Sequence, residues 1–312
     1  MKYRRWFSVS CVAISLFARG SAALDGQWTR AGGPHRSDLR VDSDLVLVPV
    51  SVTDSADRPV TGLEPAAFRV FDAGKEQKIE QFASDDAPVS VGIVFDTSAS
   101  MTRKLAKAKE AVAEFLKTSN PEDEFFLVSF SSTAQLVVPF TGNPGDIQSR
   151  LPFTDSWGRT ALLDAAYLAL QYSTRARNVR RALLVISDGG ENNSRYTENE
   201  IRRLVAEGGA WIYTIGTFDR RTPILPEEEV GGPALLTRLA SETGGRDFEV
   251  HDLSDLPRVA AKIGLALRNE YVLAFRPEER SGDGRYHRLQ VKLVKPGHYH
   301  ISSRPGYYAP AE

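Results

Sequence analysis

The chain has 312 residues, a formal net charge of −1 and a single cysteine, Cys11. A hydrophobic content of 42% and a charged content of 25% are those of an ordinary folded protein, which excludes a low-complexity chain. The balanced charge offers no basic excess for nucleic acid, so we predict no nucleic-acid partner. Because Cys11 lies near the N-terminus, the rest of the chain can form no disulfide and use no thiol chemistry.

The first 23 residues have the tripartite pattern of a secretory signal peptide. Its parts are a basic start, an apolar run and small residues for cleavage: Lys2, Arg4 and Arg5, then 6–18, then 21–23. Arg19 makes the junction irregular, so an uncleaved N-terminal anchor remains an alternative. No other stretch approaches the ~20 apolar residues of a spanning helix. We therefore predict export to the periplasm, the cell envelope or the medium, with 24–38 as a polar linker and no membrane span in the mature chain.

Residues 39–88 have the pattern of a small all-β segment. The expected strands are Leu45–Val52, Phe68–Asp72 and Gln77–Phe82, the last two joined by a hairpin turn at 72–75. This segment is too small to bury a core of its own, so it needs a partner.

Residues 89–268 alternate between strand and helix patterns. The expected strands are 89–95, 125–130, 134–138, 182–187, 211–216 and 246–250, and the expected helices are 102–117, 160–172, 198–207, 234–242 and 256–267. Repeated strand–helix units predict a mostly parallel sheet covered by helices on both faces.

Residues 269–312 return to β structure, with expected strands at Glu270–Phe275, Tyr286–Val294 and His298–Ser302. The simplest arrangement joins this tail to 39–88. The predicted fold class is therefore α/β, with a doubly wound, mostly parallel sheet inserted between two halves of a β-sandwich.

Oxygen-bearing side chains follow two of the buried strands of this sheet and begin one of its helices. Asp96, Ser98 and Ser100 follow the strand ending at Phe95, Thr160 opens a helix, and Asp188 follows the strand ending at Ser187. In a doubly wound sheet these two strands can be central neighbours, and their loops then face one crevice. Hard oxygen ligands suit Mg²⁺, Mn²⁺ or Ca²⁺ rather than zinc or copper. Taken alone, Ser98 or Ser100 could equally be an ordinary helix N-cap.

In the order and spacing of these residues the sequence resembles the von Willebrand factor type A (VWA) family. The resemblance covers about 89–267 and includes G-R-T-A-L-L-D-A from Gly158 and S-D-G-G-E-N from Ser187. It implies a metal-ion-dependent adhesion site, in which a divalent cation binds an Asp or Glu of a partner protein.

The resemblance also implies a role for each site residue. Direct ligands would be Ser98, Ser100 and Thr160, while Asp96 and Asp188 would act mainly through waters. The expected partner-facing positions are Arg159, Gly189 and Gly190. Arg159 departs from the small residue common in the family, and its guanidinium alters the charge beside the site.

Several neighbouring polar residues allow two interpretations. Asp164 either orients the metal loop or is simply exposed, and Glu191 is expected to be a solvated loop residue rather than an acceptor near the site. Lys104 is expected on a solvated helix face together with Lys107 and Lys109.

The pattern favours an exported, non-catalytic binding module. The alternative is an envelope scaffold in which the metal only stabilises the fold. An enzyme is disfavoured because neither a Walker loop nor G-x-S-x-G occurs and no nucleophile–base pair can be named.

Overall fold

The computed structural model describes residues 45–56, 58–84, 87–151, 155–218, 231–277, 284–294 and 297–309. The chain divides into two compact units, Met1–Asp38 and Leu39–Glu312, and every described residue belongs to the second. The predicted signal peptide and linker lie outside the described residues. Within the described ranges, no helix has the length and apolar character needed to cross a membrane.

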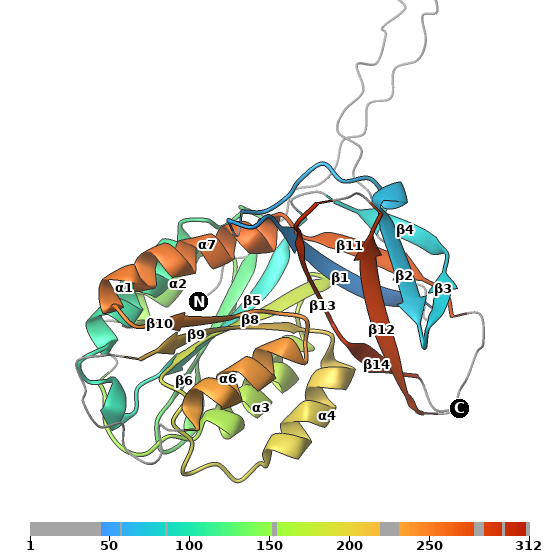
Figure 1. The fold of residues 1–312 in the computed structure, drawn as a ribbon. Coiled ribbons are helices and arrows are strands. Elements are labelled where there is room, and N and C mark those ends of the chain that lie inside the picture. The colour runs from blue at the N-terminus through green and yellow to red at the C-terminus, as the bar shows by residue number, and fades with distance from the viewer. Residues whose placement is uncertain are drawn as a thin grey trace, which may run out of the picture. The chain divides into compact units, whose positions relative to one another are not determined.

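A six-stranded sheet forms the centre of the α/β domain (Figure 1). Its spatial order is β10-β9-β8-β5-β6-β7, and all neighbours are parallel except β6 and β7. The strands are β5 (Val89–Asp96), β6 (Glu124–Phe130), β7 (Ala134–Thr141), β8 (Arg180–Ser187), β9 (Trp211–Thr217) and β10 (Asp247–Val250). The predicted mostly parallel sheet is confirmed, and β5 and β8 are central neighbours as expected.

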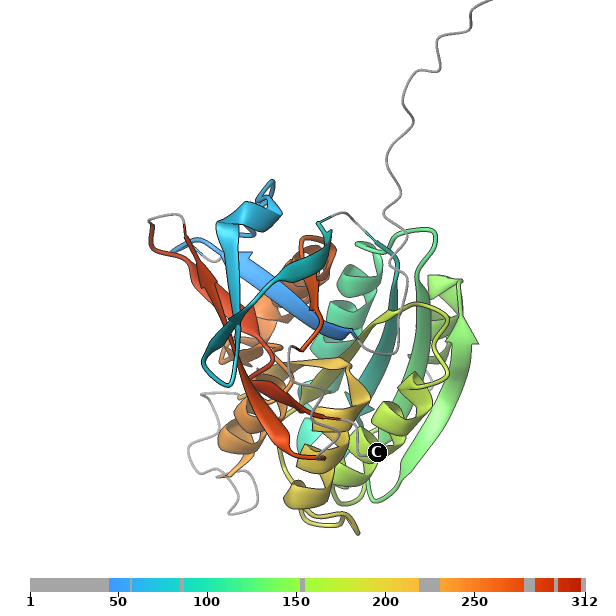
Figure 2. The same cartoon turned by 90° about the vertical axis from the view of Figure 1, so that its right-hand side faces the viewer.

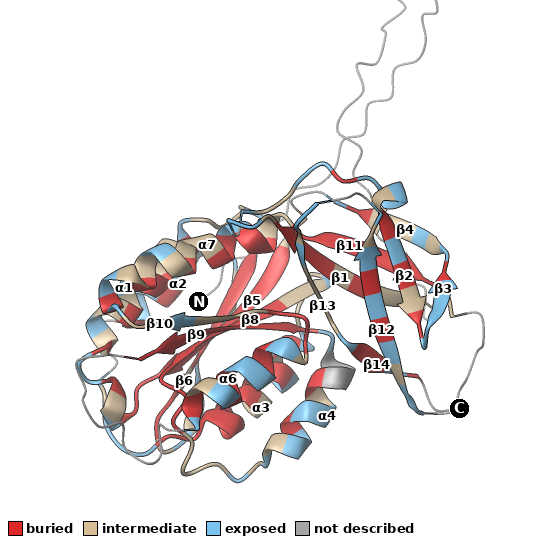
Figure 3. Ribbon diagram, viewed as in Figure 1, coloured by how far each residue is buried: buried red, intermediate tan, exposed pale blue. Residues whose placement is uncertain are grey.

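Helices cover both faces of this sheet (Figure 1). They are α1 (Leu105–Leu116), α2 (Pro144–Arg150), α3 (Leu162–Ser173), α4 (Glu198–Gly208), α6 (Gly232–Ser241) and α7 (Leu256–Arg268). One apolar core lies under α1, α2 and α7, and a second lies under α3, α4 and α6. Every residue of β5 is buried, as expected for a central strand with helices on both faces (Figure 3).

Strands from the two ends of the chain lie side by side in two further sheets (Figure 2). The first has the order β13-β1-β11-β4 and the second β14-β12-β2-β3. Their bounds are β1 (Val46–Thr53), β2 (Phe68–Asp72), β3 (Lys75–Gln77), β4 (Ile79–Ala83), β11 (Tyr271–Phe275), β12 (Tyr286–Leu293), β13 (His300–Ser303) and β14 (Gly306–Tyr308). A single apolar core, built from alternate residues such as Val48, Val50 and Val52 of β1, includes side chains of both sheets.

Three local expectations differ from the structure. The segment Gln77–Phe82 does not return as one strand, because β3 pairs with β2 whereas β4 pairs with β11 in the other sheet. Helix α2 was not expected, although Asn143 caps it by accepting from Gly145 N at 3.0 Å and Pro144 follows at the first turn. Strand β14 was also missed, because three residues are too few to show a period.

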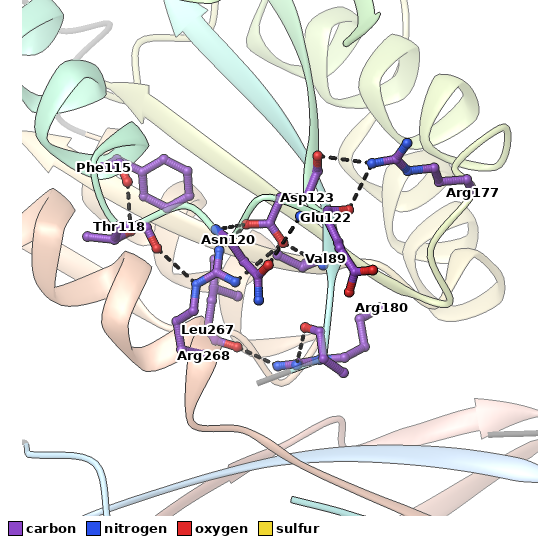
Figure 4. A network of polar contacts seen from close by, with 11 residues as sticks. Val89, Phe115, Thr118, Asn120, Glu122, Asp123, Arg177, Arg180, Leu267 and Arg268 are labelled. Atoms are coloured by element: carbon purple, nitrogen blue, oxygen red, sulfur yellow. Dashed lines mark hydrogen bonds and ion pairs between the residues drawn. The ribbon is translucent and has the colours of Figure 1, made fainter. Parts of the chain in front are cut away.

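A polar network ties together the amino end of β5, the turn before β6 and the end of α7 (Figure 4). The buried Asp123 carboxylate accepts from Val89 N at 2.9 Å and Asn120 N at 2.8 Å, and it pairs with Arg268. Arg180, at the start of β8, donates to Leu267 O at the end of α7. Charged groups therefore tie together the elements at this end of the sheet.

Candidate functional site

The two carboxylates of the predicted site lie at the same edge of the central sheet. Asp96 is the last residue of β5, and Asp188 directly follows Ser187, the last residue of β8. Because β5 and β8 are parallel neighbours, their carboxyl ends open onto one crevice at the point where the chain order of the strands reverses.

Backbone hydrogen bonds join the three loops that bear the predicted ligands. The first loop follows β5 and bears Ser98 and Ser100, the second precedes α3 and bears Thr160, and the third follows β8 and bears Asp188. Ala99 N donates to Gly158 O at 3.1 Å, which joins the first loop to the second. Asn192 N and Asn193 N both donate to Thr160 O, at 3.0 and 3.1 Å, which joins the third loop to the second. Main-chain hydrogen bonds thus hold the three loops next to one another.

Asp96 is fully buried and already well supplied with hydrogen bonds. Its Oδ1 accepts from Ser98 N at 2.8 Å and its Oδ2 from the Ser187 hydroxyl at 2.5 Å. Burial, and then the neighbouring Asp188 charge, raise the pKa of Asp96 to about 7. Asp96 therefore orients the first loop, and its raised pKa leaves it partly protonated near neutral pH.

The three hydroxyls and Asp188 belong to loops that meet at the same edge of the sheet. Ser98 Oγ and Ser100 Oγ are 3.1 Å apart. A Cβ placed on Gly190 would lie 3.4 Å from both Thr160 Oγ1 and Asp188 Oδ1, so these two oxygens flank one point of the third loop. Asp188 is fully buried and Thr160 is 4% exposed, so neither is an ordinary surface residue.

Lys104 is the main residue that the sequence interpretation placed wrongly. It was expected on a solvated helix face, but it is only 6% exposed, and its Nζ lies 2.7 Å from Asp188 Oδ2. The reason is its place at the turn before α1, where the chain has not yet adopted the helical period that separates exposed from buried positions. The only indication in the sequence was that Lys104 closely follows Ser100, one of the predicted ligands.

Two acidic residues near the site support the loops. Glu191 was expected to be solvated, but its Oε2 accepts from Leu163 N at 2.9 Å and its Oε1 from Ser194 N at 2.9 Å. Asp164 is 8% exposed and accepts from Arg195 N at 2.8 Å. Each carboxylate joins α3 to the third loop, and the orienting interpretation of Asp164 agrees with this contact.

The predicted partner-facing positions are not alike. The Arg159 side chain is exposed, while its N–H donates to Ser132 Oγ at 2.9 Å. Gly189 is buried at φ +78°, and an added Cβ would lie 2.6 Å from the backbone of Gly232, so packing against α6 explains this glycine. Trp157, 64% exposed on the second loop, adds an apolar surface that the sequence analysis did not single out.

The donor chemistry of the crevice fits a hard divalent cation. Two carboxylates and three hydroxyls come from these loops, and Lys104 Nζ lies 2.7 Å from Asp188 Oδ2. No group of three or more His, Cys, Asp or Glu side chains gathers anywhere in the described part of the chain. A cation here would therefore depend on hydroxyl and water oxygens, which magnesium tolerates and zinc sites seldom use.

Comparison with known proteins gives one family match. Residues 91–191 match the model described as "von Willebrand factor type A domain". Inter-alpha-trypsin inhibitor heavy chain H4 of Bos taurus is 26% identical over 247 residues, which are 71% of this chain and 24% of that protein. The chain thus spans about a quarter of the length of this curated relative.

Two further similarities extend this result. An uncharacterised protein of Borreliella burgdorferi is 25% identical over 216 residues, which cover 59% of this chain and 63% of that protein. The solved structure "von Willebrand factor type A from Catenulispora acidiphila" has a TM-score of 0.50 at 13% identity and covers 85% of this chain and 73% of that chain. At this identity the likeness concerns the fold alone. Residues 91–191 are thus similar in sequence to the von Willebrand factor type A domain, and the α/β domain that contains them has the fold of that domain.

Proposed function

We propose that this chain is a non-catalytic protein-binding module, which uses a divalent cation at the three-loop site to bind an acidic side chain of a partner protein. The observation that carries this proposal is the arrangement of oxygen donors from three loops that backbone hydrogen bonds join at one sheet edge. The family match to residues 91–191 agrees with a role in protein interaction.

The residues divide into ligands and positioning groups. Ser98, Ser100 and Thr160 offer neutral hydroxyls, so direct ligation by them leaves most of the cation charge unbalanced. Asp96 holds the first loop through Ser98 N and Ser187, and it supplies negative charge from behind the hydroxyls. A bound Mg²⁺ or Mn²⁺ supplies a positive centre with an exchangeable position, which a partner's Asp or Glu takes.

Lys104 gives the site a second state. In the absence of a cation, its ammonium neutralises Asp188 and keeps the third loop in place. The same ion pair favours the alternative function, a scaffold whose fold needs no metal. The binding module requires Asp188 for both cation binding and partner binding. The scaffold would keep its partner without a cation.

The exposed groups beside the site suit a partner with both charge and apolar surface. Arg159 and Trp157 lie on the second loop next to Thr160, and both are exposed. Aromatic and arginine side chains are the residues most often found to dominate binding energy at protein interfaces. We also propose that the protein is exported, from the signal-peptide pattern of residues 1–23.

The test compares wild type with Asp188→Asn, which removes the charge and keeps the shape. Thermal unfolding is followed in EDTA and in excess Mg²⁺. At about a hundred times its dissociation constant, a cation that binds only the native state adds about 2.7 kcal/mol. We expect this stabilisation in wild type and its loss in the variant.

To measure partner binding, wild type and Asp188→Asn are each immobilised and exposed to an extract of the source cell envelope. A partner retained by wild type in Mg²⁺, released by EDTA and not retained by Asp188→Asn supports the proposal. Asp155→Asn, an exposed carboxylate beside the second loop, is the matched control and should behave as wild type. If Asp188→Asn keeps both the Mg²⁺ effect and the partner, the proposed site is wrong.

A further inference from the structure

A cavity of about 830 Å³ lies at the end of the central sheet opposite the three-loop site. The first residues of three sheet strands line it, Val89 of β5, Arg180 of β8 and Trp211 of β9, together with Pro49 of β1 and Tyr307 of β14. Strand β8 begins at the cavity and ends beside Asp188, and a strand of its length spans roughly 25 Å. The cavity is thus a separate place in the molecule.

The wall of this cavity has more cations than anions. Its charged residues are four arginines and two glutamates: Arg177, Arg180, Arg181, Arg304, Glu242 and Glu270. Both glutamates are already paired, Glu270 with Arg180 at 3.2 Å and Glu242 with Arg202 at 2.5 Å.

Two of the arginines have no acidic partner. Among the described residues, neither Arg181 nor Arg304 forms an ion pair with a carboxylate, and the Arg304 guanidinium lies 5.5 Å from the centre of the Tyr307 ring. Burial lowers the pKa of Arg181 and lowers that of Arg304 to about 10. Both shifts have the direction expected for a positive charge held away from water without a counter-ion.

Hydrogen-bond donors also exceed acceptors here. Six buried side-chain polar atoms in the described residues lack a partner, and four of them belong to residues that line this cavity. All four are nitrogen donors: Asn178 Nδ2, Arg180 Nε, Trp211 Nε1 and Arg304 Nε. A buried donor without an acceptor costs free energy, so a ligand that brings acceptors to these four nitrogens would be favoured.

Much of the rest of the wall is apolar. It includes Leu47, Val272 and the rings of Trp211, Tyr307 and Tyr308. The volume lies within the range of small-molecule sites, which typically combine an apolar lining with a few polar groups that fix orientation. An inorganic anion alone would leave the apolar part of this cavity without contact.

We propose that the cavity binds an organic anion with an apolar body and a sulfonate, carboxylate or phosphate head group, and that Arg181 and Arg304 contact the head group. An anion supplies both the missing negative charge and the missing acceptors. The apolar side chains contact the body of the same molecule. This site is independent of the cation proposed at the three-loop site.

The experiment uses the fluorescent anion 8-anilinonaphthalene-1-sulfonate and its uncharged analogue N-phenyl-1-naphthylamine, titrated into the full chain in EDTA. We expect saturable binding of the anion, weakened about tenfold in Arg304→Gln and in Arg181→Gln, which is the loss expected for one charge-assisted contact. The neutral analogue should bind wild type and both variants with affinities equal within about twofold. Arg258→Gln, an arginine with a 72% exposed side chain on α7, is the control and should leave both affinities unchanged.

Competition for the fluorescent anion tests the contributions of the head group and of the apolar body separately. Displacement of the fluorescent anion by octanoate, with no displacement by inorganic phosphate at the same concentration, supports an amphipathic ligand. Displacement by phosphate alone contradicts the assigned apolar body. If circular dichroism shows that Arg304→Gln fails to fold, Arg181→Gln decides. Equal binding of the anion to wild type and to the folded arginine variants overturns the proposal.

Discussion

At the scale of single residues, the main feature of the site is the Lys104 ammonium, which lies among buried oxygen atoms. Asp188 and Lys104 are almost fully buried and lie within 2.7 Å of each other. Removing one member of a buried ion pair leaves the other as an uncompensated charge, which is strongly destabilising. A divalent cation at the proposed site would therefore compete with Lys104 for the same carboxylate.

Substitution Lys104→Met tests this competition. Without metal, the variant should unfold at a lower temperature, with a loss of about 3 kcal/mol, because Asp188 loses its counter-ion. With Mg²⁺, the stabilisation should exceed that of wild type, and the apparent affinity should rise by about tenfold because no ammonium has to be displaced. Calorimetric titration with Mg²⁺ measures the affinity directly.

The control for this substitution is Lys107→Met. Lys107 pairs with Glu110 on the exposed side of α1, and its side chain is 43% exposed. It should change neither the metal-free stability nor the Mg²⁺ affinity. Equal Mg²⁺ affinity in Lys104→Met and wild type would show that Lys104 does not occupy the cation position.

At the scale of elements, the third loop depends on close backbone packing between β8 and α6. Gly189 has φ +78°, and its Cα faces the backbone of Gly232 at the first turn of α6. A left-handed backbone and a contact of 2.6 Å for any Cβ both exclude a side chain.

We expect Gly189→Ala to lower the free energy of unfolding by about 3 kcal/mol or more, as measured by urea denaturation. Gly231→Ala is the matched control, since Gly231 has φ −83° and no atom within 4 Å of an added Cβ. That control should change stability by less than about 0.5 kcal/mol. Similar losses in both variants would mean that the contact with Gly232 does not constrain the third loop.

At the scale of the whole described unit, a buried carboxyl group joins the α/β domain to the sheets formed by the chain ends. The Glu270 carboxylate, just before β11, accepts from Tyr213 OH at 2.6 Å and pairs with Arg180 of β8. Burial is the largest influence on this group, and it raises the pKa of Glu270 to about 7 although Arg180 lowers it. Folding therefore takes up a proton at this position.

The raised pKa predicts a dependence of stability on pH. Between about pH 4.5 and pH 7 the unfolded chain has an ionised Glu270 while the folded chain keeps it protonated, so stability falls as pH rises through this window. The contribution amounts to about 3 kcal/mol, most of it present at pH 4.5 and lost above pH 7. Glu270→Gln should reduce the difference in unfolding free energy between these two pH values by a comparable amount.

Glu64→Gln serves as the control for this pH effect. Glu64 is exposed and its side chain forms no cap hydrogen bond, so its substitution should leave the pH dependence as in wild type. An unchanged pH dependence in Glu270→Gln would contradict a protonated Glu270 in the folded state.

Much of the fold and the outline of the site could be predicted from local sequence. Apolar runs such as Val91–Phe95 indicate buried strands, and the alternation of strand and helix patterns indicates the parallel sheet. Asp96 and Asp188 follow two such strands, and parallel strands bring their carboxyl ends together. These inferences need only periodicity and chain order.

The tertiary structure alone decided which polar groups are buried and what they contact. Lys104 and Glu191 have no sequence pattern that separates them from solvated residues, because a single charged side chain outside a regular period shows no face. The separation of β3 and β4 into different sheets was likewise invisible, since each strand is too short to specify its partner. The cavity lined by Arg181 and Arg304 joins segments more than a hundred residues apart, and only long-range packing brings such segments together.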